Sequence, residues 1–165
     1  MVWVVLLGVS TGMRCMTPMA VLCWCVWLGW VPDNGWAGWT GSLVSAVVFT
    51  VAALGEYVGD TLPRTPSRTS LFPLASRIVF GALVGVLVFK AFNEPAVGGV
   101  VFGLIGVMIG AFGGVRVRLW LAGLVGRDLP VAIAESVVAL GMSVGALMVI
   151  HHDLVLEAAK ARTFF

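Results

Sequence analysis

The sequence predicts an all-α integral membrane protein, a polytopic bundle of about five spans. Three observations predict this class: 60% of the 165 residues are hydrophobic and 11% are charged, and the mean hydropathy is +1.06. A soluble domain carries charge on about a quarter of its residues, so most of this surface is expected to face lipid. The net charge of +2 is too small for an electrostatic nucleic-acid partner.

Five apolar stretches are long enough to cross a hydrocarbon core of about 30 Å, which takes about 20 mostly apolar residues. They are 2–31, 42–62, 73–92, 96–126 and 130–150. The first has no Lys or Arg before its hydrophobic run, so we expect it to be retained and not cleaved as a signal. Arg14 and Pro18 interrupt the first stretch, and Arg116 and Arg118 interrupt the fourth. We expect both of these long segments to be bent or broken.

Short polar segments separate the spans and predict the orientation of the chain. A bias of Lys and Arg toward the loops on one side marks the cytoplasmic side. The basic residues that follow or flank the second and fourth spans are Arg64, Arg68, Arg77, Arg116, Arg118 and Arg127, whereas the alternate loops hold only Lys90. In a five-span chain this bias predicts a cytoplasmic N-terminus and a C-terminus outside.

The chain is predicted to form one transmembrane domain over residues 1–150, followed by a tail over 151–165. Within the tail, the spacing of apolar and charged residues over 153–160 favours a short helix along the membrane interface. The sequence His151-His152-Asp153 resembles a metal-binding tract only superficially, because no further ligands occur at matching spacing. We therefore predict no metal site there.

Ionisable residues at membrane depth are the main functional signal, because they are costly in lipid and normally face a bundle interior or a water cavity. Glu56 and Asp60 are four residues apart and share a helix face. Two carboxylates that close suit a shared proton or cation. With Glu135, and with Arg14 and Arg116 as counter-charges, they predict an ion- or solute-binding cluster near the cytoplasmic face. The alternative is a set of ion pairs that only fixes how the helices dock.

A stripe of glycines follows one face of the fourth span. Its members are Gly99, Gly103, Gly106, Gly110 and Gly113. Such spacing favours close helix–helix packing over a substrate path. The stripe is also the feature of the sequence that favours a homo-oligomer.

The loop after the second span offers guanidinium groups and hydroxyls to a phosphate. Its candidate residues for a lipid head group are Arg64, Ser67, Arg68 and Thr69. The alternative is an ordinary basic loop that sets the topology. No nucleophile elbow, P-loop, dinucleotide fingerprint or zinc-protease motif occurs. We therefore predict no catalytic residue and no cofactor, and nothing in the sequence argues for an enzyme.

Several motifs together resemble a known family. They are LGEYVGDTLPRTPSRT over 54–69, GMRCMTP over 12–18, GAFGGVR over 110–116 and DLPVAIAE over 128–135. This set is similar to the family of small bacterial membrane proteins catalogued as domain of unknown function 4126, over nearly the whole chain. Thr61 departs from the pattern, because family members often have lysine there. The resemblance implies a multi-pass protein of the bacterial inner membrane and supplies no activity.

These features lead to one leading hypothesis and two alternatives. The leading hypothesis is a small transporter or channel-like protein that binds a small ion or polar solute at the carboxylate and arginine cluster. The first alternative is a protein that binds or handles lipid head groups through the basic loop. The second is a structural subunit of a larger membrane complex. Membrane lipids are expected partners in each case.

Overall fold

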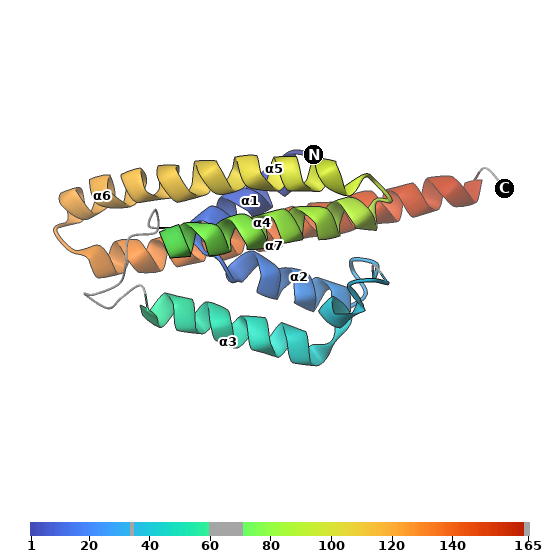
Figure 1. The fold of residues 1–165 in the computed structure, drawn as a ribbon, viewed down its shortest axis with the longest axis horizontal. Coiled ribbons are helices and arrows are strands. Elements are labelled where there is room, and N and C mark those ends of the chain that lie inside the picture. Colours follow the sequence, from blue (N-terminus) through green and yellow to red (C-terminus); the bar gives the residue numbers. More distant parts are fainter. Residues whose placement is uncertain (34, 60–70, 164–165) are drawn as a thin grey trace.

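The computed structural model describes residues 1–33, 35–59 and 71–163, which form an all-helical bundle (Figure 1). The elements are α1 (Val2–Met13), α2 (Thr17–Trp27), the 3-10 turn η1 (Gly38–Gly41), α3 (Leu43–Gly59), α4 (Leu71–Ala91), α5 (Ala96–Met108), the π-helical segment η2 (Ile109–Gly113), α6 (Gly114–Val125) and α7 (Asp128–Thr163). The predicted all-α class is confirmed for this part of the chain.

Three helices in the described residues are long and apolar enough to cross a membrane, judged by length and composition. They are α4 over Leu71–Ala91, the continuous run of α5, η2 and α6 over Ala96–Val125, and α7 over Asp128–Arg162. The helices α1, α2 and α3 are apolar but shorter. The protein is therefore a membrane-embedded helical bundle, and its first segment departs from a simple series of spans.

The first predicted span is two helices that turn back on one another. Met1 lines a pocket together with Asp153 of α7, and the Nδ1 of His151 donates a hydrogen bond of 2.8 Å to the carbonyl oxygen of Trp30. The start of α1 and the segment that follows α2 therefore lie beside the same part of α7, around residues 151–153. The α1–α2 pair is a re-entrant hairpin, in which α1 extends about 18 Å into the bundle.

The α1–α2 hairpin affects the path of the chain between its two termini. In Figure 1 the C-terminus lies at the far tip of α7, whereas the N-terminus lies nearer the middle of the long axis of the molecule. The chain changes direction at the break after Met13, between α1 and α2 (Figure 1). The number of crossings and the sides on which the two termini lie stay predictions.

The helix α1 lies at the centre and is held by backbone-to-backbone contacts. It packs against α4, α5 and α7. A Cβ built on Gly106 would collide with the carbonyl oxygen of Val5, and one built on Gly8 would collide with the carbonyl oxygen of Gly103. On the other side of α5, Gly99 meets the backbone of Gly85 in the same way. Most of the glycine stripe is thus used inside one chain, so it supplies no argument for contacts between copies.

The interruption of the fourth segment differs from the expected one. It is the π-helical segment Ile109–Gly113, and Arg116 and Arg118 lie within the regular helix α6. Residues 151–163 also differ from expectation, because they continue α7 without a break. This segment contains neither glycine nor proline and is rich in good helix formers. The predicted separate interfacial helix is therefore the last part of a 36-residue helix.

Candidate functional site

The break between α1 and α2 leaves backbone polar groups inside the bundle. Arg14 follows α1 in an extended conformation, with φ −137° and ψ 105°. Pro18 lies in the first turn of α2, where its missing N–H costs nothing because the first N–H groups of a helix have no partner within it. Arg14 and Thr17 are 1% exposed, so the break is buried. Groups on neighbouring helices must therefore form hydrogen bonds with the backbone polar groups of the break.

Glu56 of α3 binds the N-terminus of α2. Its Oε1 accepts a hydrogen bond of 2.8 Å from the N–H of Cys15, and its Oε2 accepts one of 3.0 Å from the N–H of Met16. The hydroxyls of Tyr57 and Thr17 are also 2.7 Å apart. A carboxylate at a helix N-terminus is favoured by both the free N–H groups and the helix dipole. Two consecutive residues of α3 thus hold the start of α2.

Arg77 of α4 pairs with Glu56. Its Nη2 lies 3.5 Å from the Oε1 of Glu56, and the two side chains are 4% and 14% exposed. From the sequence, Arg77 was expected only to contribute to the basic bias that sets the topology. The signal that could have identified it is its position, because an arginine almost two turns inside an apolar helix normally needs an interior partner.

Arg14 joins the break to α7. Its Nη2 donates a hydrogen bond of 3.1 Å to the carbonyl oxygen of Ala132. Its guanidinium carbon lies 5.2 Å from the centre of the Tyr57 ring, within the range of a cation–π contact. The hydroxyl of Ser136 also donates to the carbonyl oxygen of Ala132, at 2.9 Å. Helices α1, α3 and α7 therefore meet around Arg14.

A second charged cluster lies where α6 turns into α7. Arg118 contacts both carboxylate oxygens of Asp128, at 2.9 Å and 2.6 Å, and its Nη1 lies 3.7 Å from the Oε2 of Glu135. Glu135 is 8% exposed. Arg116, which was expected to be a counter-charge, is exposed on α6. The contact with Glu135 comes from Arg118, two residues along, because the two arginines point in different directions around the helix.

Among the described residues, the members of the predicted cluster lie in two places, with Glu56 beside Arg77 and Glu135 beside Arg118. Arg14 lies between them, since its acceptor Ala132 is one turn before Glu135 on α7. Asp60 lies outside the described residues, and so do the lipid-phosphate candidates. Those candidates are Arg64, Ser67, Arg68 and Thr69.

The glycines of the predicted stripe do not all have the same surroundings. Gly99, Gly103, Gly106 and Gly110 all lie in backbone contact with a neighbouring helix, whereas a Cβ on Gly113 would have no neighbour within 4 Å. The end of the stripe therefore opens onto a groove. This groove, of about 360 Å³, lies between α1, α6 and α7 and includes Glu135. A second groove, of about 390 Å³, lies between α3 and α7 and includes Arg14.

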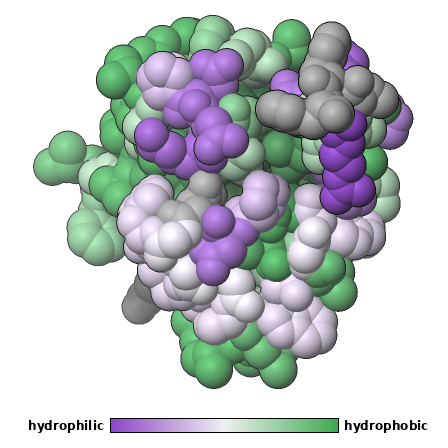
Figure 2. Space-filling model, turned by 90° about the vertical axis from the view of Figure 1, so that its right-hand side faces the viewer, coloured by the Kyte–Doolittle hydropathy of each residue, from purple (hydrophilic) through white to green (hydrophobic). Residues whose placement is uncertain are grey.

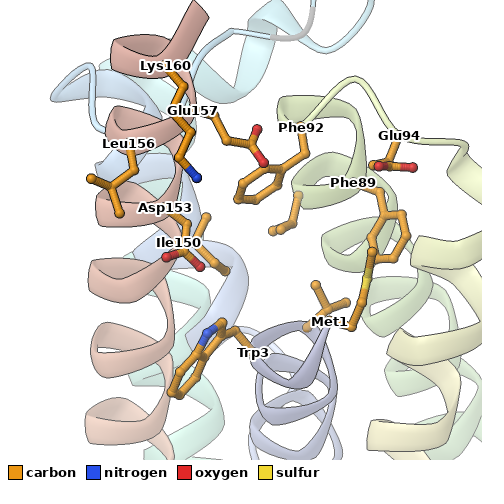
Figure 3. Close-up of a pocket in the computed structure, with 12 residues that line it drawn as sticks. Met1, Trp3, Phe89, Phe92, Glu94, Ile150, Asp153, Leu156, Glu157 and Lys160 are labelled. Carbon is orange, nitrogen blue, oxygen red and sulfur yellow. The ribbon is translucent and has the colours of Figure 1, made fainter.

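The end of the molecule near the α4–α5 connection and the last part of α7 carries a polar surface. Figure 2 shows hydrophilic side chains gathered on this end, with hydrophobic side chains around them. A pocket of about 290 Å³ opens here, and Figure 3 shows Asp153 and Glu157 of α7 on one side of it and Glu94 and Phe89 on the other. Among the residues that the structure describes, no group of three or more His, Cys, Asp or Glu side chains could hold a metal ion.

No family model, curated protein or solved structure matches this chain. The resemblance to domain of unknown function 4126 stays a prediction.

Proposed function

We propose that this protein is a small transporter or channel-like protein and that the α1–α2 break is its binding site for a small ion or polar solute. The observation that carries the proposal is the capping of a broken helix inside the bundle by Glu56, which accepts the N–H groups of Cys15 and Met16. The ligand would bind among Glu56, Arg77 and Arg14.

The physical support comes from the cost of irregular backbone in a membrane. Non-helical backbone is tolerated at membrane depth only where protein buries it or where it lines a water-filled cavity. In many transporters such half-helix ends form the substrate and ion sites. Helix α1 has 12 residues, so its C-terminal end lies about 18 Å from its start, well inside a core of about 30 Å.

We further propose that the arginine-rich end faces the cytoplasm of a bacterial inner membrane. Arg118 and Arg127 lie toward the end where α6 meets α7, opposite the end at which α7 carries the C-terminus (Figure 1). In this arrangement α3, α4, the α5–α6 run and α7 would make four crossings. The positive-inside rule would then place both termini outside, with the α1–α2 hairpin entering the membrane from that side. This arrangement replaces the five-span expectation and reverses the expected side of the N-terminus.

Single cysteines test this orientation in right-side-out membrane vesicles. The native Cys15, Cys23 and Cys25 are at most 6% exposed, so they give little background with a membrane-impermeant maleimide. We expect His152→Cys to react from outside and Arg127→Cys to react only after the vesicles are opened. The reverse pattern would overturn the orientation without affecting the binding site.

A flux assay tests the function itself. The full chain in liposomes would be tested with a pH-sensitive dye for protons and with ion-sensitive dyes for Na⁺ and Cl⁻. We expect flux of at least one ion above that of protein-free liposomes, and Glu56→Gln should abolish most of it because it removes the charge at the break. Glu157→Gln, on an exposed surface at the other end, is the matched control and should retain it. Equal flux in both variants would contradict the proposal.

The alternative of lipid head-group binding by the basic loop depends on Arg64, Ser67, Arg68 and Thr69, which lie outside the described residues. It stays a prediction, as does the alternative of a structural subunit.

A further inference from the structure

We propose that the pocket at the start of α1 binds a small organic cation with an apolar group, of the arylalkylammonium class. The pocket has a volume of about 290 Å³. A cavity of about 150 Å³ holds a benzene molecule, so this pocket has room for a ring and a short charged chain. The start of α1 is about 18 Å from the end of α1 at the break. This site is therefore separate from, and independent of, the ion or solute site proposed above.

The floor of the pocket is apolar and formed by buried side chains of three helices. Val4 of α1, Val88 of α4 and Ile150 of α7 line it, and they are 4%, 0% and 2% exposed, respectively. Because α1 packs against both α4 and α7, the floor exists before any ligand arrives. An apolar group that enters the pocket is removed from water against this floor, which is favourable in proportion to the area buried.

Aromatic rings from two sides of the pocket complete its apolar surface. Trp3, Phe89 and Phe92 line it (Figure 3). The ring of Phe89 is held in place, because it stacks on Phe102 with the ring centroids 6.0 Å apart and lies directly against Gly98 of α5. A ring that is already fixed loses little freedom when a ligand binds. The face of an aromatic ring attracts a cation, most strongly in the case of Trp.

Carboxylates lie on opposite sides of the pocket. Asp153 belongs to α7 and Glu94 to the α4–α5 connection (Figure 3). The turn at Asn93, with φ 56°, and a hydrogen bond of 2.9 Å from the N–H of Glu94 to the carbonyl oxygen of Phe89 fix the position of Glu94. The side chain of Glu94 makes no hydrogen bond or ion pair with any residue that the structure describes. Asp153 has an ion pair, at 3.8 Å, with its neighbour His152.

The charge of the whole lining favours a cation. It includes the carboxylates of Glu94, Asp153 and Glu157 and the ammonium of Lys160. Even when the amino group of Met1 is counted as positive, the net charge of the lining stays negative. None of these carboxylates caps α1, whose start has no side-chain hydrogen bond. The pocket opens on the hydrophilic surface in Figure 2, so an ammonium group can approach from water and place its apolar group on the floor.

Binding of radiolabelled 2-phenylethylammonium to the full chain in a non-ionic detergent tests this site. We expect saturable binding above that of protein-free micelles. Unlabelled benzyltrimethylammonium should displace the probe. An equal concentration of 3-phenylpropionate, an anion with a similar apolar group, or of Na⁺ should not. Binding that does not saturate, or equal displacement by the organic cation and the organic anion, would overturn the proposal.

Two matched variants test the charge. Asp153→Asn removes a carboxylate from the pocket and keeps the shape of the side chain, whereas Asp33→Asn makes the same change on an exposed residue outside this pocket. We expect Asp153→Asn to weaken probe binding about two- to five-fold, the range for a partly exposed charge pair, and Asp33→Asn to leave it unchanged. Circular dichroism checks that both variants fold. Equal affinity in the two folded variants would overturn the proposal.

A second pair of variants tests the aromatic contact. Phe92→Leu keeps an apolar side chain in the pocket and removes the ring, whereas Phe112→Leu removes a ring that is 41% exposed on η2. We expect Phe92→Leu to weaken probe binding about two- to five-fold, the range for an exposed cation–π contact, and Phe112→Leu to have no effect. Equal affinity in this pair would place the ligand outside the pocket. This pair decides the question if Asp153→Asn does not fold.

The outcomes for the pocket and for the proposed function are distinguishable. Glu56→Gln should lose ion flux and keep probe binding, because Glu56 lies at the break. Saturable probe binding by a chain that shows no flux would support the pocket and refute the transporter. Flux by a chain that does not bind the probe would refute the pocket and keep the transporter.

Discussion

The two helices of the re-entrant hairpin are held in opposite ways. Helix α1 is held by shape, because glycines let its backbone touch that of α5, as at Gly8 and Gly106. The start of α2 is held by charge and hydrogen bonds, through Glu56 and Tyr57 of α3. A contact that depends on shape has one geometry, whereas a polar contact can exchange one partner for another. The hairpin therefore has one helix, α1, with a fixed position, and a junction, formed by the start of α2 with Glu56 and Arg77, whose polar contacts can be exchanged.

This difference suggests where a ligand could act. A solute that competes for Glu56 or Arg77 would alter the junction without disturbing the glycine contacts around α1. We expect effects on stability that decrease from the Glu56 contacts, through the glycine contacts, to the hydroxyl pair of Thr17 and Tyr57.

The largest effect is expected from the loss of the carboxylate at the junction. Glu56→Ala leaves Arg77 and the N–H groups of Cys15 and Met16 without this acceptor. Breaking a buried pair from one side costs about 3–5 kcal/mol, and the free energy of unfolding in mixed detergent micelles measures it. Glu157→Gln, on the surface, should change it by less than about 0.5 kcal/mol. A loss below about 1 kcal/mol would show that the junction is not held by charge.

A smaller effect is expected at the glycine contacts. In Gly106→Ala the new methyl group would collide with the carbonyl oxygen of Val5, and overpacking of this kind costs about 1–3 kcal/mol. Gly141→Ala is the matched control, because a Cβ there has no neighbour within 4 Å. Alanine is the better helix former by about 1 kcal/mol, so the control should be neutral or stabilising. If the two variants have the same free energy of unfolding in the same assay, close glycine contacts do not hold α1 in place.

The smallest effect is expected for the hydroxyl pair of Thr17 and Tyr57, whose oxygens are 2.7 Å apart. Tyr57→Phe and Thr17→Val should each cost about 1 kcal/mol, the usual net value of one hydrogen bond. A double-mutant cycle isolates the pair, and the two losses should not add. Additive losses would mean that the hydroxyls act independently, and the polar account of the junction would then rest on Glu56 alone.

Sequence reasoning identified several parts of the site but not their pairing. Arg14 and Glu56 were recognised because ionisable residues at membrane depth require interior partners. The partner arginines were different from those expected, since Arg77 contacts Glu56 and Arg118 contacts Glu135. Arg116 and Arg118 are two residues apart, so their side chains point to different sides of α6. Which of them faces Glu135 could be decided only once the position of α7 beside α6 was known.

The sequence by itself determined the helical membrane class, the presence of the break near Arg14 and the places where glycines occur, because hydrophobic length, charge at depth and small side chains are local properties. Only the tertiary structure decided that the chain reverses between α1 and α2 and that Glu56 binds the start of α2. The physical reason is that a break allows a chain either to continue or to reverse. The choice depends on which distant helix satisfies the exposed N–H groups.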